Sequence, residues 1–593
     1  MESAPAWNRK DWVICLTLGL LALALYCSGR NQEIQGDDDY LYVANFSMIS
    51  DAILAFHPGN PGPLASKLSN LAGQILCAPR HAPLPAVIHA AFYTLCHGLH
   101  VPFSMDLLHF PTGAIGAMAV SLFYALLRRF ARHGRILCAA GAVLLLLSPI
   151  FTMVSRGLGA YFLAFIPFTT LIALWGLLSL NRNLTPNWLI GLALAQVVVS
   201  DVIWFITLPT LLVAFIGGTE NRRQSIRSLC SLKVFGPGAI TVLLLLTGTW
   251  VAYHKGLATP LSKLLLEHGT KVIQGSPVIA SPAYLAECLS VLLGVAFPVL
   301  LPLGIALWSM TGKPWKPELM TAFGLAGVLI YGAIFYGLTP ERVFVKLCYQ
   351  TYLLLPFLFI VIALLSRLKS SFRPGPVVAA FALGILLVFE SLACANFIWK
   401  IPVSPANSIF SEWGHGTISP NRGTKAAGYL ARQWIEAVWR QNPKQPITLY
   451  AGKYNTSFAI FSGLNAGEKG WTFIPEFGPD RPITALSAPV LETLATKSAS
   501  GTPAMVYVFD FSAESLPTTL NITPLIENRP SLLSYTIRSS SPANGLALVL
   551  VRPPKGMSIP PVTPGDISME DCESRFDKTY TRYYDFFPRH FAP

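Results

Sequence analysis

The chain has 593 residues, of which 53% are hydrophobic and only 12% are charged, and its formal net charge is +13. Soluble domains carry about 25% charged residues, so the composition excludes an ordinary soluble protein and predicts a polytopic α-helical membrane protein. A basic excess is typical of the cytoplasmic loops of such proteins. No basic patch interleaved with aromatic residues indicates nucleic-acid binding.

The first apolar segment, residues 12–29, is long enough to cross a bilayer. No small-residue cleavage site follows it, which predicts an uncleaved helix with a cytoplasmic N-terminus. Asp37, Asp38 and Asp39 come shortly after it and are expected at the membrane–water interface. Neighbouring carboxylates repel each other and raise the pKa of at least one, which suits a general base. The alternative is a solvated turn that ends the helix.

Basic clusters predict the orientation of the later spans, because such clusters favour the cytoplasm. Placing all of them there gives about eleven spans and puts the segment after residue 398 outside. The basic clusters are Arg128–Arg135, Arg182, Arg222–Lys233, Lys313–Lys316 and Arg367–Arg373. The predicted spans after the first are 105–127, 136–154, 158–180, 188–200, 202–218, 234–253, 284–311, 318–338, 351–366 and 376–398.

Two apolar stretches must be interpreted so that the number of spans stays odd and every basic cluster stays in the cytoplasm. Pro83–Leu99 begins Pro-Leu-Pro and is short, so we interpret it as an interfacial or re-entrant helix on the outer face. The stretch 188–218 is too long for one span and contains Asp201 near its middle. It is therefore predicted to form two short helices that meet at the outer surface.

The sequence predicts two domains. Residues 1–398 form a transmembrane module whose first outer loop, 31–104, carries interfacial helices. Residues 399–593 have ordinary charge density and form a soluble α/β domain on the outer side, with one helix at Thr424–Gln441. Its strands are predicted from short β-like runs separated by turn residues. These runs are Ile447–Tyr450, Met505–Phe509, Leu532–Ile537 and Leu546–Val551.

Several short motifs occur in a fixed order on the outer side of the predicted membrane module. They are Asp37-Asp38-Asp39-Tyr40, Arg80-His81-Ala82-Pro83-Leu84, Ser148-Pro149 through Ser155-Arg156, and Tyr352-Leu353-Leu354-Leu355-Pro356. This arrangement resembles the polyprenyl-phosphate-sugar-dependent membrane glycosyltransferases of the GT-C superfamily, such as protein O-mannosyltransferases and lipid A aminoarabinose transferases. Two departures are Ala82 in place of the usual proline, and Gln350-Thr351 where an arginine often stands.

The resemblance implies an inverting glycosyltransferase that takes a sugar from a polyprenyl-phosphate carrier. The acceptor is a lipid, glycan or protein at the outer face of the cytoplasmic membrane. In these families one carboxylate of the first loop deprotonates the acceptor hydroxyl. Alignment selects Asp37 or Asp38 for this role, depending on the spacing used, and leaves Asp39 and Tyr40 as supporting neighbours. No cofactor is indicated, although a divalent metal stays open.

Five basic residues on the outer side are candidates to bind the donor phosphate: Arg80, His81, Arg156, Arg342 and Lys346. Arginine suits bidentate phosphate contacts. For the first three, the alternative is a side chain that lies beside an apolar helix and reaches the interface. For Arg342, the alternative is a pair with Glu341.

Asp201 is a supporting candidate that orients substrate, or else caps the second of its two short helices. Asp37-x-Asp39 also fits the metal-binding D-x-D motif of nucleotide-sugar enzymes. Nucleotide sugars are cytoplasmic, however, and this loop is predicted outside, so no metal site is assigned.

Two other classes of function stay open. One is a transporter or flippase for lipid-linked sugars, which would be expected to carry more intramembrane charges than Glu287 and Glu390. The other is an O-antigen ligase or polymerase, whose working residues lie in a large late loop. The largest membrane-module loop of this chain is the first, which favours the transferase.

Overall fold

The computed structural model describes the chain in segments that cover most of the predicted membrane module and five strands of the C-terminal region. The described residues are 7–27, 46, 48–57, 59–77, 82–101, 105–130, 134–156, 161–180, 185–201, 203–218, 222–254, 319–332, 351–371, 374–399, 448–451, 505–512, 532–538, 544–551 and 566–568.

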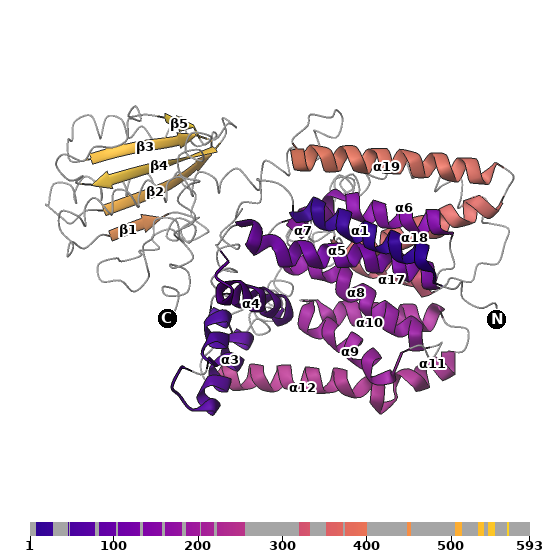
Figure 1. The fold of residues 1–593 in the computed structure, drawn as a ribbon, viewed down its shortest axis with the longest axis horizontal. Coiled ribbons are helices and arrows are strands. Elements are labelled where there is room, and N and C mark those ends of the chain that lie inside the picture. Colours follow the sequence, from indigo (N-terminus) through magenta and orange to yellow (C-terminus); the bar gives the residue numbers. More distant parts are fainter. Residues whose placement is uncertain are drawn as a thin grey trace, which may run out of the picture. The chain divides into compact units, whose positions relative to one another are not determined.

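The described part of the module is helical, as the apolar composition predicts (Figure 1). The helices are α1 (Arg9–Cys27), α3 (Leu64–Cys77), α4 (Pro83–Gly98), α5 (Met105–Phe130), α6 (Arg135–Leu147), α7 (Pro149–Arg156), α8 (Tyr161–Leu180), α9 (Asn187–Ser200), α10 (Trp204–Gly218), α11 (Arg222–Leu229), α12 (Leu232–His254), α17 (Leu319–Gly332), α18 (Thr351–Ser371) and α19 (Gly375–Trp399).

The chain is a multi-pass membrane protein. Within the described ranges, five helices are long and apolar enough to cross a bilayer, or six if the bent pair α6–α7 counts as one span. Shorter apolar helices, among them α9, α10 and α12, supply further membrane-embedded candidates. The predicted span 284–311 lies outside the described residues, so the predicted total of eleven stays a prediction.

One predicted span differs in shape from the expectation. Residues 136–154 were expected as one helix, but the structure has α6 and α7, bent by 59° at the break between them. Ser148 has non-helical backbone angles of −56° and 121°. Pro149 explains the break, because a proline disfavours the helical conformation of the residue before it and has no N–H to continue the helix.

The chain folds into two compact units, each built from segments that are separated in the sequence. The first comprises Met1–Glu33, Ala52–Leu95 and Met105–Trp413, and the second comprises Ile34–Asp51, Cys96–Ser104 and Gly414–Pro593. The predicted boundary at residue 398 stays a prediction, as does the placement of the tail outside the membrane.

In the first unit, α1 packs antiparallel to α5. Ser121 Oγ donates to the Cys15 carbonyl at 3.1 Å, whereas Gly113, two turns earlier in α5, faces Cys27 at the far end of α1. A Cβ on Gly113 would stand 2.6 Å from Cys27 Sγ, so the two helices approach closely only because this position is a glycine. Small residues at such contacts are typical of helix pairs in membranes.

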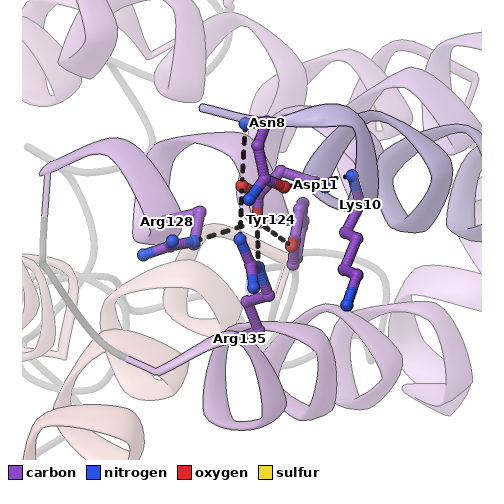
Figure 2. Close-up of polar contacts among 6 residues, drawn as sticks. All are labelled: Asn8, Lys10, Asp11, Tyr124, Arg128 and Arg135. Atoms are coloured by element: carbon purple, nitrogen blue, oxygen red, sulfur yellow. Dashed lines mark hydrogen bonds and ion pairs between the residues drawn. The ribbon is translucent and has the colours of Figure 1, made fainter. Parts of the chain in front are cut away.

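A single aspartate joins the beginnings and ends of three helices (Figure 2). Asp11, in the first turn of α1, is fully buried and accepts from Arg128 Nε at 3.0 Å and Arg135 Nε at 2.9 Å. Tyr124 donates to the same carboxylate at 3.1 Å. Arg128 ends α5 and Arg135 begins α6, so these contacts define one end of the helical unit, which we call the Asp11 end.

The helices alternate in direction from that end. Phe130 and Trp175 are in ring contact, so α8 ends near the Asp11 end. Gln196 of α9 donates to the Thr169 carbonyl, and Gly176 lies against Ile190, so α9 runs back away from it. Asp201 therefore lies at the opposite end, which we call the Asp201 end.

The short amphipathic helix α3 lies across the far end of α12 (Figure 1). Leu76 of α3 meets Gly248 of α12, where a Cβ would stand 2.6 Å from Leu76 Cδ1. The interfacial position expected for the helices of the first loop stays a prediction.

The second unit contains a mixed five-stranded sheet in the order β1-β2-β4-β3-β5. Its strands are β1 (Thr448–Ala451), β2 (Met505–Ser512), β3 (Leu532–Arg538), β4 (Asn544–Val551) and β5 (Asp566–Ser568). The first four confirm the predicted runs. β5 was not predicted, because three residues are too few to show an alternating pattern. The predicted helix Thr424–Gln441 lies outside the described residues.

Candidate functional site

The structure describes two of the predicted site residues, Arg156 and Asp201. Both lie at the Asp201 end of the helical unit. The other predicted site residues lie outside the described residues: Asp37, Asp38, Asp39, Tyr40, Arg80, His81, Arg342 and Lys346. Their roles therefore stay predictions. The structure describes only helices that come before or after them in the chain.

Arg156 is the last residue of α7 and is only 8% exposed. Its Nη1 donates a short hydrogen bond to the Leu25 carbonyl, in the last turn of α1. Carbonyl groups in the last turn have no hydrogen-bond partner within the helix and lie at the negative end of the helix dipole. A cationic donor therefore supplies the missing hydrogen bond and a favourable charge interaction. Arg156 is thus held inside the protein against α1, contrary to the alternative in which it reaches out to the interface.

This contact fixes the point at which α1 ends. The three aspartates begin ten residues after Cys27, so Arg156 holds the helix from which their segment leaves. The neighbouring Ser155 packs against Gly116 of α5, where a Cβ would stand 2.5 Å from Ser155 Oγ. Helices α1, α5 and α7 therefore meet closely at this end.

Asp201 lies between α9 and α10, as the predicted split requires, and is only 2% exposed. Its Oδ1 accepts from the Ile203 backbone N–H at 2.9 Å, just before α10 begins. This is the contact expected of a capping aspartate. The carboxylate has further partners, however, so capping does not account for all of its geometry.

Three hydroxyl groups from three helices extend the Asp201 contacts. The Tyr352 hydroxyl of α18 donates to Asp201 Oδ1 at 2.5 Å, and Thr207 of α10 donates a short hydrogen bond to Oδ2. Tyr331 of α17 in turn donates to Thr207 Oγ1 at 3.1 Å. The rings of Tyr331 and Tyr352 lie 5.6 Å apart. We call Asp201, Thr207, Tyr331 and Tyr352 the Asp201 network.

Burial dominates the electrostatics of this carboxyl. It raises the pKa of Asp201 to about 6, because the charged form loses its water, while the hydrogen bonds from Thr207, Tyr352 and Ile203 oppose the shift. A carboxylate that accepts three hydrogen bonds can hold neighbouring groups in place, but in the described structure its oxygens face protein donors.

Sequence reasoning missed two polar contacts inside the helical unit. His89 of α4 is buried, with Nδ1 2.8 Å from the Pro85 carbonyl and Nε2 2.8 Å from Thr112 Oγ1. The carbonyl can only accept, so Nδ1 carries the proton and Nε2 accepts from the threonine. Burial lowers the pKa of His89 to about 4, so the ring is neutral at pH 7 and joins α4 to α5.

The second missed feature is the Asp11 pairing shown in Figure 2. Arg128 and Arg135 indicated topology in the sequence, but nothing there indicated a shared partner. The only signal was that Asp11 is the single acid at the start of an apolar segment. An acid at that depth is costly unless paired.

No group of three or more His, Cys, Asp or Glu side chains in the described ranges could hold a metal ion. Within those ranges, the Asp201 end offers buried hydrogen-bond donors, one fixed arginine and one buried carboxylate. Such an arrangement can hold helix ends in fixed positions.

No protein-family model matches the chain, and no curated protein matches it. Among solved structures, ArnT from Cupriavidus metallidurans bound to undecaprenyl phosphate superposes with a TM-score of 0.50 at 13% identity, over 91% of this chain and 97% of ArnT. The oligosaccharyltransferase AglB from Archaeoglobus fulgidus, in complex with an inhibitory peptide and a dolichol-phosphate, gives 0.46 at 13% identity, over 85% of this chain and 70% of AglB. The chain shares the fold of ArnT.

Proposed function

We propose that this protein is a membrane glycosyltransferase that takes a sugar from a polyprenyl-phosphate carrier and transfers it to a hydroxyl acceptor with inversion. The observation that carries the proposal is the shared fold, which extends over 91% of this chain and 97% of a structure bound to undecaprenyl phosphate. The order of the acidic and basic motifs on the predicted outer side supports it independently.

In the proposed reaction, Asp37 or Asp38 removes the proton from the acceptor hydroxyl. The hydroxyl oxygen then attacks the anomeric carbon, and the carbon–oxygen bond to the carrier phosphate breaks. The leaving polyprenyl phosphate keeps the bonding electron pair as negative charge. Positioning and electrostatic stabilisation of that charge supply most of the catalysis.

Basic residues would bind the phosphate, as proposed for Arg80, His81, Arg342 and Lys346. For Arg156, the geometry supports a different role. Its guanidinium is directed at the last turn of α1, so we propose that it holds the helix that carries the aspartate segment. Asp39 and Tyr40 would support the base within that segment.

We propose that the reaction takes place at the Asp201 end, on the outer side of the cytoplasmic membrane. The N-terminus and the Asp11 end would then face the cytoplasm. This assignment is supported by the basic residues at the Asp11 end, including Arg128 and Arg135. The α/β domain would lie outside, on the side of the acceptor.

The test is turnover by the purified full-length protein in liposomes. Polyprenyl-phosphate sugars would be supplied as donors with a glycolipid fraction as acceptor, and released undecaprenyl phosphate would be measured by mass spectrometry. Release that depends on acceptor, and that is lost in an Asp37→Asn/Asp38→Asn double variant, supports the proposal. Release equal to that of protein-free liposomes with every donor contradicts it.

One observation favours a transporter for lipid-linked sugars as a second candidate. Glu390 of α19 is only 7% exposed, and its Oε2 has no hydrogen-bond partner among the described residues. Intramembrane acids commonly mark transport pathways. Movement of a fluorescent lipid-linked sugar between leaflets, unchanged by aspartate substitution and reduced in Glu390→Gln, would favour this alternative.

A further inference from the structure

The Asp11 end carries more positive charge than its carboxylate neutralises. Arg128 and Arg135 both bind Asp11, and Arg9 and Lys10, which precede it in the first turn of α1, are exposed. Among the described residues of α1, of α6 and of the last turns of α5, Asp11 is the only acidic one. A surplus of positive charge therefore remains at this end.

The Asp11 carboxylate has no capacity for a further cation. Its Oδ1 accepts from Tyr124, Arg128 and Arg135. Its Oδ2 accepts from the Asn8 backbone N–H at 3.1 Å and from Arg135 Nη2 at 3.3 Å. A carboxylate offers about four acceptor sites, so these donors already saturate it.

Two basic groups at this end keep donors that Asp11 does not use. Arg128 binds Asp11 through Nε, and its two terminal nitrogens have no hydrogen-bond partner in the described part of the chain. Figure 2 shows those nitrogens directed away from the carboxylate, and the Lys10 ammonium without a contact to the other residues drawn. A guanidinium with both terminal nitrogens available suits a phosphate, which it can bind with two parallel hydrogen bonds.

Exposed apolar side chains border these cations. Trp12 and Ile136 directly follow Asp11 and Arg135 and are 58% and 84% exposed, and Leu16 is exposed one turn further along α1. The Trp7 ring packs edge-on against Trp12 at 5.4 Å. Tryptophan is enriched where a membrane meets water. The basic groups therefore lie at the depth of lipid headgroups, next to a surface that suits acyl chains.

We propose that the Asp11 end is a binding site for an anionic phospholipid of the bilayer. The phosphate binds Arg128 and Lys10, Arg9 adds attraction, and the acyl chains lie along Trp12 and Leu16. A headgroup with net negative charge complements the surplus positive charge, whereas a zwitterionic headgroup carries its own ammonium group. The site does not depend on the proposed sugar transfer, because none of its residues takes part in that reaction.

The experiment measures phosphatidylglycerol binding to the purified, delipidated full-length protein in neutral detergent by native mass spectrometry. Phosphatidylcholine is the zwitterionic probe. Arg9→Gln/Lys10→Gln removes two exposed charges and leaves the side-chain contacts of Asp11 in place. Arg128→Lys keeps the charge and removes the planar fork. The matched control, Arg223→Gln/Arg227→Gln, removes two exposed charges from α11.

We expect the wild type to bind phosphatidylglycerol more tightly than phosphatidylcholine. Each basic residue near an anionic lipid contributes about fivefold in affinity, so Arg9→Gln/Lys10→Gln should weaken the tightest phosphatidylglycerol site by about 25-fold. Arg128→Lys should weaken it by about tenfold, through the loss of a charge-assisted hydrogen bond. The α11 control should stay within about twofold of the wild type. Thermal unfolding of the Arg9→Gln/Lys10→Gln variant in lipid-free detergent should match the wild type.

Several outcomes would overturn the proposal. They are equal affinity for the two phospholipids, unchanged binding in Arg9→Gln/Lys10→Gln, and an equal loss in the α11 control, which would indicate attraction by net charge alone. Displacement of phosphatidylglycerol by an equal concentration of undecaprenyl phosphate would assign the site to the sugar carrier instead. If Arg128→Lys unfolds at a lower temperature, the Arg9→Gln/Lys10→Gln result decides. Absence of sugar transfer would contradict the proposed function and leave this site unaffected.

Discussion

The Tyr352 hydroxyl donates a 2.5 Å hydrogen bond to Oδ1 of Asp201, across 151 residues of sequence. This contact connects the turn between α9 and α10 to the first turn of α18. Asp201, for which the sequence left substrate orientation and helix capping open, therefore also joins a helix that comes much later in the chain.

Replacing the proposed base should abolish turnover without unfolding the protein. Removal of a general base typically costs about 10²–10⁴-fold in rate. Asp37→Asn and Asp38→Asn preserve size, so the base variant should fold and bind undecaprenyl phosphate normally while losing sugar transfer. Full activity in the Asp37→Asn/Asp38→Asn double variant would remove the basis for assigning catalysis to this segment.

Loss of the Arg156 contact should loosen the end of α1. Arg156→Gln removes the cation from the helix C-terminus and should lower the free energy of unfolding by about 1–2 kcal/mol. Sugar transfer should fall as well, because the aspartate segment follows that helix. The control is Arg227→Gln on the exposed face of α11, which should change neither quantity. A variant as stable and active as the wild type would exclude this role for Arg156.

Breaking the Asp11 pairing should destabilise the helical unit more strongly. Asp11→Asn leaves the guanidinium groups of Arg128 and Arg135 without their anionic partner, at side-chain exposures of 12% and 34%. Removing one member of a buried ion pair costs about 3–5 kcal/mol of stability. Because both arginines are partly exposed, the free energy of unfolding should fall by at most about 3 kcal/mol. Thermal unfolding in detergent measures this, with exposed Lys10→Gln as the control.

The stability of the helical unit should depend on pH through His89. Its pKa is lowered to about 4 in the folded protein, below about 6.5 in the unfolded chain. Between these values the unfolded chain binds the proton more readily, so stability is full above pH 6.5 and falls as the pH drops toward 4. The loss should reach about 3 kcal/mol relative to His89→Gln. A constant difference between the two proteins across this pH range would contradict this.

The orientation can be tested with reporter fusions at six positions. Fusions after His133, Ser225 and Ser370 should report the cytoplasm, because they follow basic segments. Those after Asn60, Leu265 and Pro420 should report the outside. An outside signal at His133 would mean that Pro83–Leu99 crosses the membrane, and the proposed arrangement of the first outer loop would have to be rebuilt.

The helices of the described module were largely predictable because their signal is local. Long apolar runs predicted α1, α5, α8, α18 and α19, and the length of the stretch around Asp201 predicted its division in two. The bend at Ser148 could also have been predicted, since Pro149 is visible in the sequence. It was missed because hydropathy averages over a window and does not register one backbone break.

The contacts of the site could not be predicted in the same way. That Asp11 meets Arg135, or that Tyr331 meets Thr207, depends on which helices are neighbours, and a single sequence contains no direct signal for this. Arg156 illustrates the limit: its position at a helix end was correct, but only the packing of α1 against α7 shows that it is directed inward.

The attachment of α1 at both its ends has a consequence for biosynthesis. Asp11 finds Arg128 only 117 residues later, and Leu25 finds Arg156 only 131 residues later. At translation rates of about 5–20 residues per second, α1 waits about 6–26 s in the translocation machinery or bilayer before these partners are made. Arg156 is the last of these partners to be synthesised, so α1, α5, α6 and α7 can pack together while most of the chain is still unsynthesised. Substitutions at Asp11 or Arg156 should therefore be most harmful during this early assembly of the membrane helices.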